Sequence, residues 1–202
     1  MKTLLALSLL FTASAAQAGL IKGDFLAQGN GMLITDTATH FEWLSPVYTR
    51  SLAYNSGPIQ SLETTYGFRY ATYAEAYSMI TSNFGFVTTV AVGDAAGFNA
   101  AQNFMNIFGT AEFVSCGSPC PRTQGLTADQ GAFPNTHYGI GMITFGTTGW
   151  MIDHNSWSDN SADQQMGSWL VRGGSSAPAT PEPASVGLAL AGLGAVLLFR
   201  RR

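Results

Sequence analysis

The chain has 202 residues, a formal net charge of −3 and only 10% charged residues, which excludes a strongly basic nucleic-acid-binding protein. With 46% hydrophobic residues, it is also too apolar for a solvated disordered chain. The hydrophobic residues are concentrated at the two ends, so we expect one folded domain between two terminal signals rather than a multi-span membrane protein.

The N-terminus has the features of a secretory signal peptide, which we place at residues 1–18. After a basic start, residues 4–11 are apolar, and Ala16 and Ala18 are small residues at the spacing that signal peptidase recognises. The apolar run of roughly 8 residues is too short for a transmembrane helix, which needs about 20. We therefore predict that signal peptidase cleaves before Gly19 and that the protein is exported.

The exported part is acidic. Residues 19–180 carry five basic and eleven acidic side chains, a net charge of −6. This charge argues against DNA, RNA and anionic lipid as direct ligands. A stretch of about 150 residues is long enough for one independent core, so residues 19–172 are interpreted as a single domain.

A β-hairpin is the first element that we predict in this domain. Residues 25–28 and 32–35 have strand character, and Gly29-Asn30-Gly31 between them tolerates positive φ angles. The glycines favour a tight turn that pairs the two strands.

Two helices are predicted next. Thr72 and Glu75 have the spacing of a capping box, so a helix should run from Tyr73 to about Asn83 and end by Gly85. Asp94 can cap a second helix that ends at Gly109. One face of this second helix carries Phe98, Ala101, Met105 and Phe108.

The segment from Glu112 to Thr136 is interpreted as long and irregular, and it is a candidate binding surface.

The remaining elements are strands. Residues 138–145 and 150–154 flank a four-residue loop at 146–149, and residues 168–172 form a final strand. Two helices among antiparallel strands predict an α+β fold.

Cys116 and Cys120 form the clearest covalent feature. In an exported chain, two cysteines separated by Gly-Ser-Pro predict a loop-closing disulfide. A redox dithiol is the alternative, although thioredoxin-type sites have two intervening residues ahead of a helix. A zinc site would need two further ligands, and there is no second cysteine pair.

The histidines do not predict a shared metal or a catalytic triad. If Phe145 pairs with Trp150, His137 and His154 lie roughly 13 Å apart along the hairpin. Asp153, His154 and Ser156 are residues of the types found in a triad, but neighbours on a strand point to opposite faces of the sheet.

One polar loop is a candidate ligand or calcium site. It contains Trp157, Asp159, Asn160 and Asp163. Calcium takes six to eight oxygen ligands, and a tryptophan beside them could stack on a sugar face. The alternative is an ordinary polar loop between strands.

Three segments, taken in order, resemble a family of exported bacterial domains. Residues 39–44 read Thr-His-Phe-Glu-Trp-Leu, residues 67–72 read Gly-Phe-Arg-Tyr-Ala-Thr, and residues 167–172 read Gly-Ser-Trp-Leu-Val-Arg. They resemble the Thr-Gly-Leu-Glu-Trp-Leu, Gly-Trp-Arg-Leu-Pro-Thr and closing Val-Arg segments of domains related to the C-terminal domain of collagen-like adhesins. The resemblance implies a C-type-lectin-like fold. His40 replaces the usual Gly, the cysteines common near the closing strand are missing, and no sugar-ligand set carries over.

The alternative interpretation of these segments is ordinary core packing. Their hydrophobic residues alternate with polar neighbours, as half-buried strand residues do; they are Trp43, Phe68, Tyr70, Trp169 and Val171. Arg69 or Arg172 would then pair with an acid such as Glu42 or Glu75.

The C-terminus has three parts after a Pro/Gly/Ser-rich linker at residues 173–180. They are Pro181-Glu182-Pro183, an apolar run at residues 184–199, and Arg200-Arg201-Arg202. A helix over the apolar run would be about 24 Å long, short of a ~30 Å hydrocarbon core, but it can insert with its arginines snorkelling towards the cytoplasm.

Residues 181–202 closely resemble the PEP-CTERM sorting signal of bacterial proteins. The resemblance implies recognition by exosortase, an inner-membrane enzyme that cuts near the tripeptide, and a role in exopolysaccharide and biofilm production. A permanent C-terminal anchor is the alternative.

We therefore expect an exported protein that is held briefly in the inner membrane by its C-terminal helix and then reaches the cell surface or extracellular matrix. We expect it to be non-enzymatic, without a cofactor, and to bind polysaccharide or a matrix protein. One alternative is a calcium-stabilised structural domain that stays anchored in the inner membrane. The other is an exported hydrolase, whose catalytic groups would come from Glu112, Asp153, His154, Asp159 and Asp163.

Overall fold

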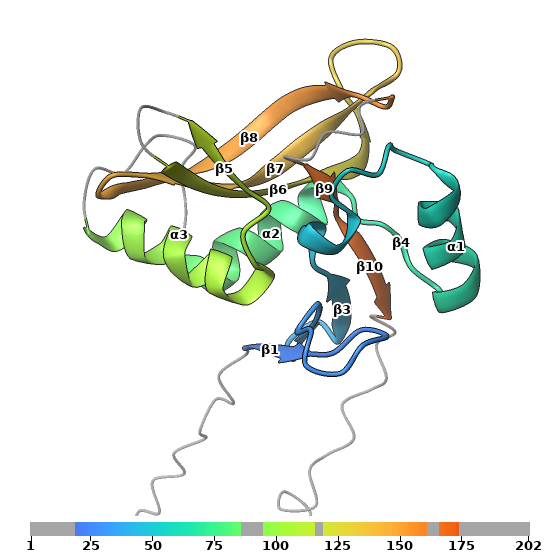
Figure 1. Ribbon diagram of the computed structural model, residues 1–202, viewed down its shortest axis with the longest axis horizontal. Coiled ribbons are helices and arrows are strands. Elements are labelled where there is room, and N and C mark those ends of the chain that lie inside the picture. The colour runs from blue at the N-terminus through green and yellow to red at the C-terminus, as the bar shows by residue number, and fades with distance from the viewer. Residues whose placement is uncertain (1–18, 86–94, 116–118, 161–165, 174–202) are drawn as a thin grey trace, which may run out of the picture.

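The computed structural model describes residues 19–85, 95–115, 119–160 and 166–173. Within these residues the chain forms three α-helices and two β-sheets, a mixed α+β arrangement (Figure 1). The predicted signal peptide and sorting signal lie outside the described residues, as do residues 174–180 of the linker. Asp94, Cys116 and Asp163 also lie outside them.

The first sheet joins strands from both ends of the domain. Its strands, in spatial order, are β1 (Leu20–Gly23), β2 (Leu33–Asp36), β3 (Phe41–Leu44), β10 (Leu170–Gly173) and β4 (Arg69–Tyr70). Each strand is antiparallel to its neighbours. Leu20 pairs with Asp36, and Gly173 pairs with Phe41, so the described chain enters and leaves at the same end of this sheet.

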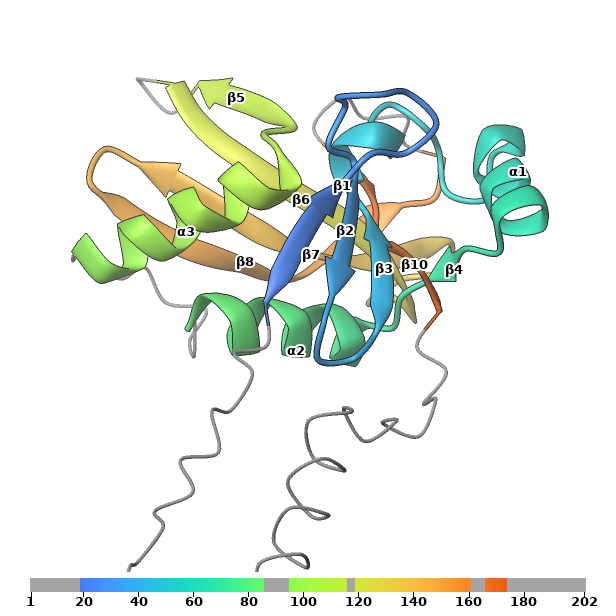
Figure 2. The ribbon, with the colours of Figure 1, turned by 90° about the horizontal axis from the view of Figure 1, so that it is seen from below.

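The second sheet is built from long antiparallel strands. They are β5 (Glu112–Ser115), β6 (Pro119–Gln130), β7 (Thr136–Phe145) and β8 (Thr148–Ser158), with β9 (Gly167–Ser168) parallel to β6. Helices α2 (Tyr73–Phe84) and α3 (Ala95–Phe108) cover one face of this sheet (Figures 1 and 2). Helix α1 (Gly57–Tyr66) lies at the β4 side of the first sheet, and a 3-10 helix, η1 (Pro46–Thr49), follows β3.

The capping box predicted for α2 is confirmed. The Thr72 hydroxyl accepts a hydrogen bond from the Glu75 backbone N–H, and the Glu75 carboxylate accepts one from the Thr72 N–H. The helix ends at Gly85, whose φ of 71° lies in the left-handed region that glycine adopts at low cost. The sequence therefore predicted both ends of α2 to within one residue.

The second predicted helix, α3, is also confirmed. Ala101, Met105 and Phe108 are buried on its inner face, and the Gly109 N–H bonds to the Met105 carbonyl to close its last turn. The prediction of only two helices was wrong, because α1 was missed. Only Ile59 and Leu62 are buried in α1, so its apolar stripe is too narrow to recognise by periodicity.

The core between helices and sheets is aromatic. The Trp169 ring contacts the rings of Trp43, Phe104 and Phe108, with centroids 5.1 to 6.1 Å apart. The Trp169 indole N–H donates to the Ile140 carbonyl at 2.9 Å, which ties the residue between β9 and β10 to β7. A second cluster lies under α1 and contains Phe25, Leu44, Ile59, Leu62, Phe68, Tyr70 and Leu170.

The three segments on which the family resemblance rests become neighbours in the first sheet. They supply β3, β4 and β10, and Val171 pairs with Trp43 on one side and with Arg69 on the other. The prediction of core packing is confirmed, because the five alternating hydrophobic residues are all buried. Arg69 and Arg172 each pair with one of the two acids named as possible partners, Arg69 with Glu75 and Arg172 with Glu42, each at 2.7 Å.

The first hairpin prediction was wrong in its pairing. Strand β1 lies before the predicted strand, at Leu20–Gly23, and residues 24–32 form a loop held by side chains. The Asp24 carboxylate accepts hydrogen bonds from the Gly29 and Gly31 N–H groups. Phe25 lies in this loop and packs into the second cluster.

Three predictions for the second half of the domain also need correction. The segment from Glu112 to Thr136 is not irregular, because it supplies β5 and the 12-residue strand β6. The β7–β8 loop has two residues rather than four, since Phe145 pairs with Thr148 and Gly146 takes a φ of 57°. The final strand is split into β9 and β10.

Candidate functional site

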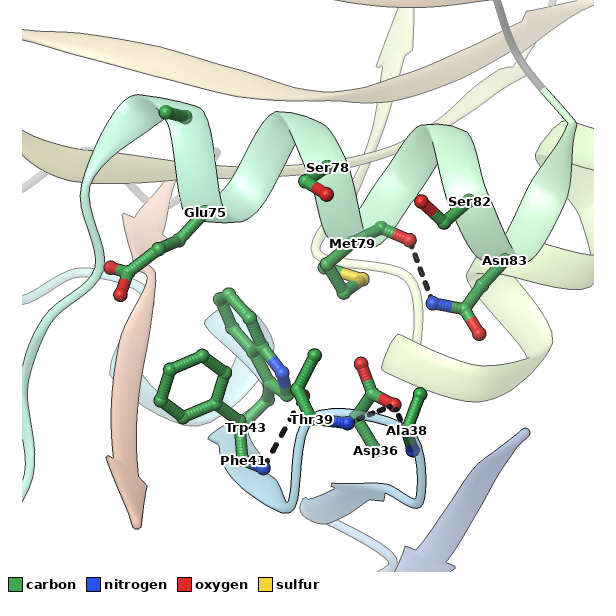
Figure 3. A pocket seen from close by; sticks show the side chains of 11 residues that line it. Asp36, Ala38, Thr39, Phe41, Trp43, Glu75, Ser78, Met79, Ser82 and Asn83 are labelled. Carbon is green, nitrogen blue, oxygen red and sulfur yellow. Dashed lines mark hydrogen bonds between the residues drawn. The ribbon is translucent and has the colours of Figure 1, made fainter. Parts of the chain in front are cut away.

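A pocket lies between α2 and the β2–β3 turn (Figure 3). Its volume is ≈ 410 Å³, and most of its lining is apolar. Helix α2 supplies one wall, with residues at i, i+3, i+4, i+7 and i+8 that share a helix face: Glu75, Ser78, Met79, Ser82 and Asn83. The opposite wall comes from Asp36, Ala38, Thr39, Phe41 and Trp43. Phe41 and Trp43 alternate along β3 and therefore point to the same side of the strand, whereas Thr39 belongs to the turn before it.

The Trp43 side chain has an unpaired donor at this pocket. The residue is 1% exposed, and its indole nitrogen Nε1 has no hydrogen-bond partner. Figure 3 shows this nitrogen on the edge of the ring that faces the space between Met79 and Asp36. A buried donor without an acceptor costs about 1–3 kcal/mol, so an acceptor in the pocket would be stabilised there.

Asp36 supplies an acceptor on the opposite wall. Its Oδ1 accepts hydrogen bonds from the N–H groups of Ala38 and Thr39, at 2.8 and 3.3 Å, which fixes the β2–β3 turn. The second carboxylate oxygen points into the pocket (Figure 3). The turn also requires a φ of 58° at His40, a left-handed conformation that glycine adopts more readily than histidine.

Glu75 at the rim is neutralised by Arg69. The guanidinium makes two hydrogen bonds to the carboxylate, at 2.7 and 2.8 Å. These bonds hold the pKa of Glu75 below its ordinary value. Arg69 also lies 5.8 Å from the centroid of the Phe41 ring. The uncompensated acid of the pocket is therefore Asp36, because the pocket lining includes no lysine or arginine.

Sequence reasoning missed this pocket, although both of its walls were partly visible. Trp43 and Glu75 were assigned only structural roles, and Asp36, Met79 and Asn83 were not selected. The small polar residues at 78, 82 and 83, which lie beside the buried Met79 on α2, were the available signal. They could not be matched to Asp36 without the tertiary structure.

Asp153 and His154 come together on the second sheet, contrary to the sequence argument. Gly139 pairs with Asn155 but Gly141 pairs with Ile152, so β8 carries one extra residue and forms a bulge. His154 takes a φ of 49° at this bulge, and its Nδ1 lies 2.8 Å from Asp153 Oδ1. Alternation along the strand fails here because the bulge turns both side chains to one side.

Other groups complete this Asp153–His154 cluster. The Tyr73 hydroxyl donates to Asp153, and the Tyr73 ring lies 4.2 Å from the His154 ring. The Tyr138 ring approaches His154 edge-on at 5.1 Å. Ser156 does not join the cluster in a triad, since its hydroxyl accepts from the Ala132 N–H.

The predicted polar loop is only partly described. The Asp159 carboxylate lies 2.6 Å from His137 Nδ1, and the Asp159 N–H bonds to the Asn135 carbonyl. Trp157 lies on β8, and its indole nitrogen is buried and unpaired. Asn160 donates its N–H to the Ser158 hydroxyl at 3.4 Å. Asp163 lies outside the described residues, so the calcium prediction stays a prediction.

His137 belongs to a stack of rings at the same end of β7. The Tyr54 ring stacks on His137 with centroids 3.7 Å apart and on Tyr70 at 4.1 Å. Burial raises the pKa of Tyr54 well above its ordinary range, and the neighbouring Tyr70 adds to the shift. The stack attaches the loop before α1 to the second sheet.

The described ranges contain no group of three or more His, Cys, Asp or Glu side chains placed to hold a metal ion. Cys120 is buried beside Ile143 and Ile152, whereas its predicted partner Cys116 lies outside the described residues. No helix within the described part of the chain is both long and apolar enough to cross a membrane.

The C-terminal segment matches a known family of sorting signals. Residues 179–202 match the PEP-CTERM protein-sorting motif. The motif implies that the protein is exported, processed by exosortase and associated with the cell surface. No curated protein and no solved structure matches the chain significantly. The C-type-lectin-like fold is therefore not confirmed for the middle domain.

Proposed function

We propose that the folded domain is a non-enzymatic, glycan-binding module that its sorting signal delivers to the cell surface or extracellular matrix. The pocket between α2 and the β2–β3 turn carries the proposal. It combines an aromatic wall at Phe41 and Trp43, a buried unpaired donor and a carboxylate acceptor. Small-molecule sites have this composition, with apolar walls and a few convergent polar groups.

Polysaccharide is favoured over a matrix protein because of the shape of the site. A cavity of ≈ 410 Å³ suits one or two sugar units better than a broad protein surface, which buries about 800 Å² on each partner. Hydroxyl groups can accept from Trp43 and donate to Asp36 at the same time. A weak contact of this kind gains strength when many copies bind one polymer.

Glycan binding is tested by titrating the exported protein with exopolysaccharide purified from its host. We expect saturable binding that Asp36→Asn weakens at least tenfold, because the substitution replaces an acceptor oxygen by a donor amide. Asp24→Asn is the matched control, since Asp24 also holds a turn through its carboxylate but lies at the other end of β1. Equal binding by both variants, or no binding by the wild type, would contradict the proposal.

Delivery is tested by intact mass with and without exosortase. The processed protein should begin at Gly19 and end near Pro181, and this form should vanish in the deletion strain. A chain that still ends at Arg202 in both strains would support the permanent inner-membrane anchor instead.

A hydrolytic function is the second candidate, and one observation favours it. The Asp153–His154 contact orients an imidazole that is about half exposed, with 56% of its side chain accessible. Such a pair could act as a general base. Release of reducing ends from the host polysaccharide, lost in His154→Gln, would establish an enzyme. Unchanged polymer would leave binding as the function.

A further inference from the structure

Resting on the proposed glycan-binding function, we propose that the pocket recognises the acetamido group of an N-acetylated amino sugar. An acetamido group presents a carbonyl acceptor, an N–H donor and a methyl group in one rigid plane. The pocket presents a donor at Trp43, an acceptor at Asp36 and an apolar surface between them. The assignment rests on this match, in which the pocket's donor, apolar surface and acceptor face the carbonyl, methyl and N–H of the acetamido group.

The unpaired N–H of Trp43 favours a ligand whose hydrogen-bond acceptor reaches deep into the pocket. Trp43 is 1% exposed, so bulk water does not satisfy its Nε1. An indole N–H can only donate. A ligand group at this position must therefore be a carbonyl or hydroxyl oxygen, and an ammonium group is excluded because it has no acceptor.

The Asp36 carboxylate favours a ligand with a hydrogen-bond donor on the opposite side. Asp36 is 3% exposed, and its Oδ1 is already engaged by two backbone N–H groups. The carboxylate oxygen that faces the pocket can accept from an amide N–H or a hydroxyl but repels another carboxylate. Uronic acids are therefore disfavoured, although they are common in acidic polysaccharides.

The remaining walls fit a methyl group and the sugar hydroxyls. Met79, Ala74 and Phe41 supply the apolar surface near Trp43. Ser78 and Ser82 lie one turn apart on α2 and can bond ring hydroxyls. The Asn83 amide donates one N–H to the Met79 carbonyl at 2.9 Å, so its second N–H and its oxygen remain for a ligand.

The test is a matched series of sugars titrated into the exported protein. N-acetylglucosamine and N-acetylgalactosamine are each compared with the parent amine and the parent hydroxyl sugar, with binding followed by NMR shifts of indole N–H signals. We expect at least one acetylated sugar to bind tenfold or more tightly than both of its parents. An acetyl-lysine peptide is included, because it carries the same acetamido group on a different molecule.

Variants assign the two polar contacts. Asp36→Asn should abolish the preference for the acetylated sugar, while Asp24→Asn should keep it. Trp43→Phe retains an aromatic ring without the N–H and should weaken binding of the acetylated sugar at least fivefold. The wild-type series decides the inference even if one of these variants fails to fold.

The outcomes separate this inference from the proposed function. Equal binding of acetylated sugars and their parents would overturn the acetamido assignment and leave glycan binding intact. Binding of the acetyl-lysine peptide alone would overturn the sugar assignment and with it the glycan function. No binding of any sugar or of host polysaccharide would overturn both.

Discussion

Trp43 and Trp169 offer a direct test of the unpaired donor in the pocket. Both indoles are buried, at 1% and 0% exposure, and they pack against one another. The Trp169 N–H donates to the Ile140 carbonyl at 2.9 Å, whereas the Trp43 N–H has no partner. Replacement by phenylalanine removes the same atoms from the same core in each case, so the packing losses are similar.

The hydrogen bond then decides the difference in stability. Trp169→Phe leaves the carbonyl of Ile140, a fully buried residue, without its donor, which costs about 1–3 kcal/mol beyond the packing loss. Trp43→Phe removes a donor that was already unpaired, so this cost is absent. For a domain of about 150 residues, each kcal/mol corresponds to about 2–4 °C in Tm. We expect Trp169→Phe to melt about 2–12 °C below Trp43→Phe.

Calorimetry and urea denaturation of the two variants, compared with wild type, measure this difference. Equal loss of stability in both variants would refute the reasoning. It would mean that Trp43 Nε1 has a bonding partner, and the case for an acceptor-seeking pocket would fail with it.

Three further predictions concern stability and pH. Gly167→Ala should unfold the domain or lower its free energy of unfolding by several kcal/mol, since a Cβ there would collide with the Pro46 backbone carbonyl; a Tm within 2 °C of wild type would contradict this. Because the pKa of Glu75 is lowered in the folded state, its stabilisation is present above the unfolded value and is lost as the pH falls through the folded one. Glu75→Gln should therefore lower stability at pH 7 by about 1 kcal/mol and flatten the loss of stability below about pH 4.5, as followed by urea denaturation across pH 2–7. The pKa of Tyr54 is raised, so its neutral form stabilises the fold below the ordinary tyrosine value, and this contribution is lost as the pH rises. Tyr54→Phe should keep the ring stack and unfold less steeply above about pH 10 than wild type, and identical alkaline melting curves would argue against a buried Tyr54 hydroxyl.

Structural features that depend only on residues close together in the sequence were predicted well. The capping box of α2 needs only Thr72 and Glu75, and the end of α3 needs only the spacing of its apolar residues and Gly109. The sequence also named Glu42 and Glu75 as possible partners of Arg69 or Arg172, although which arginine meets which acid came from the structure. In contrast, α1 has only two buried hydrophobic residues, so its helical state depends on packing against the second cluster.

The sequence by itself determined where this protein is sent, because the sorting motif at residues 179–202 is contiguous and is read as a linear signal. It also determined the main helices and the aromatic strands of the core. Only the tertiary structure decided which groups meet. Asp36 faces Met79 across the pocket because the β2–β3 turn folds against α2, and Asp153 meets His154 because a bulge interrupts the alternation of β8. Both contacts depend on strand register, and register is set by long-range packing rather than by local residue preference.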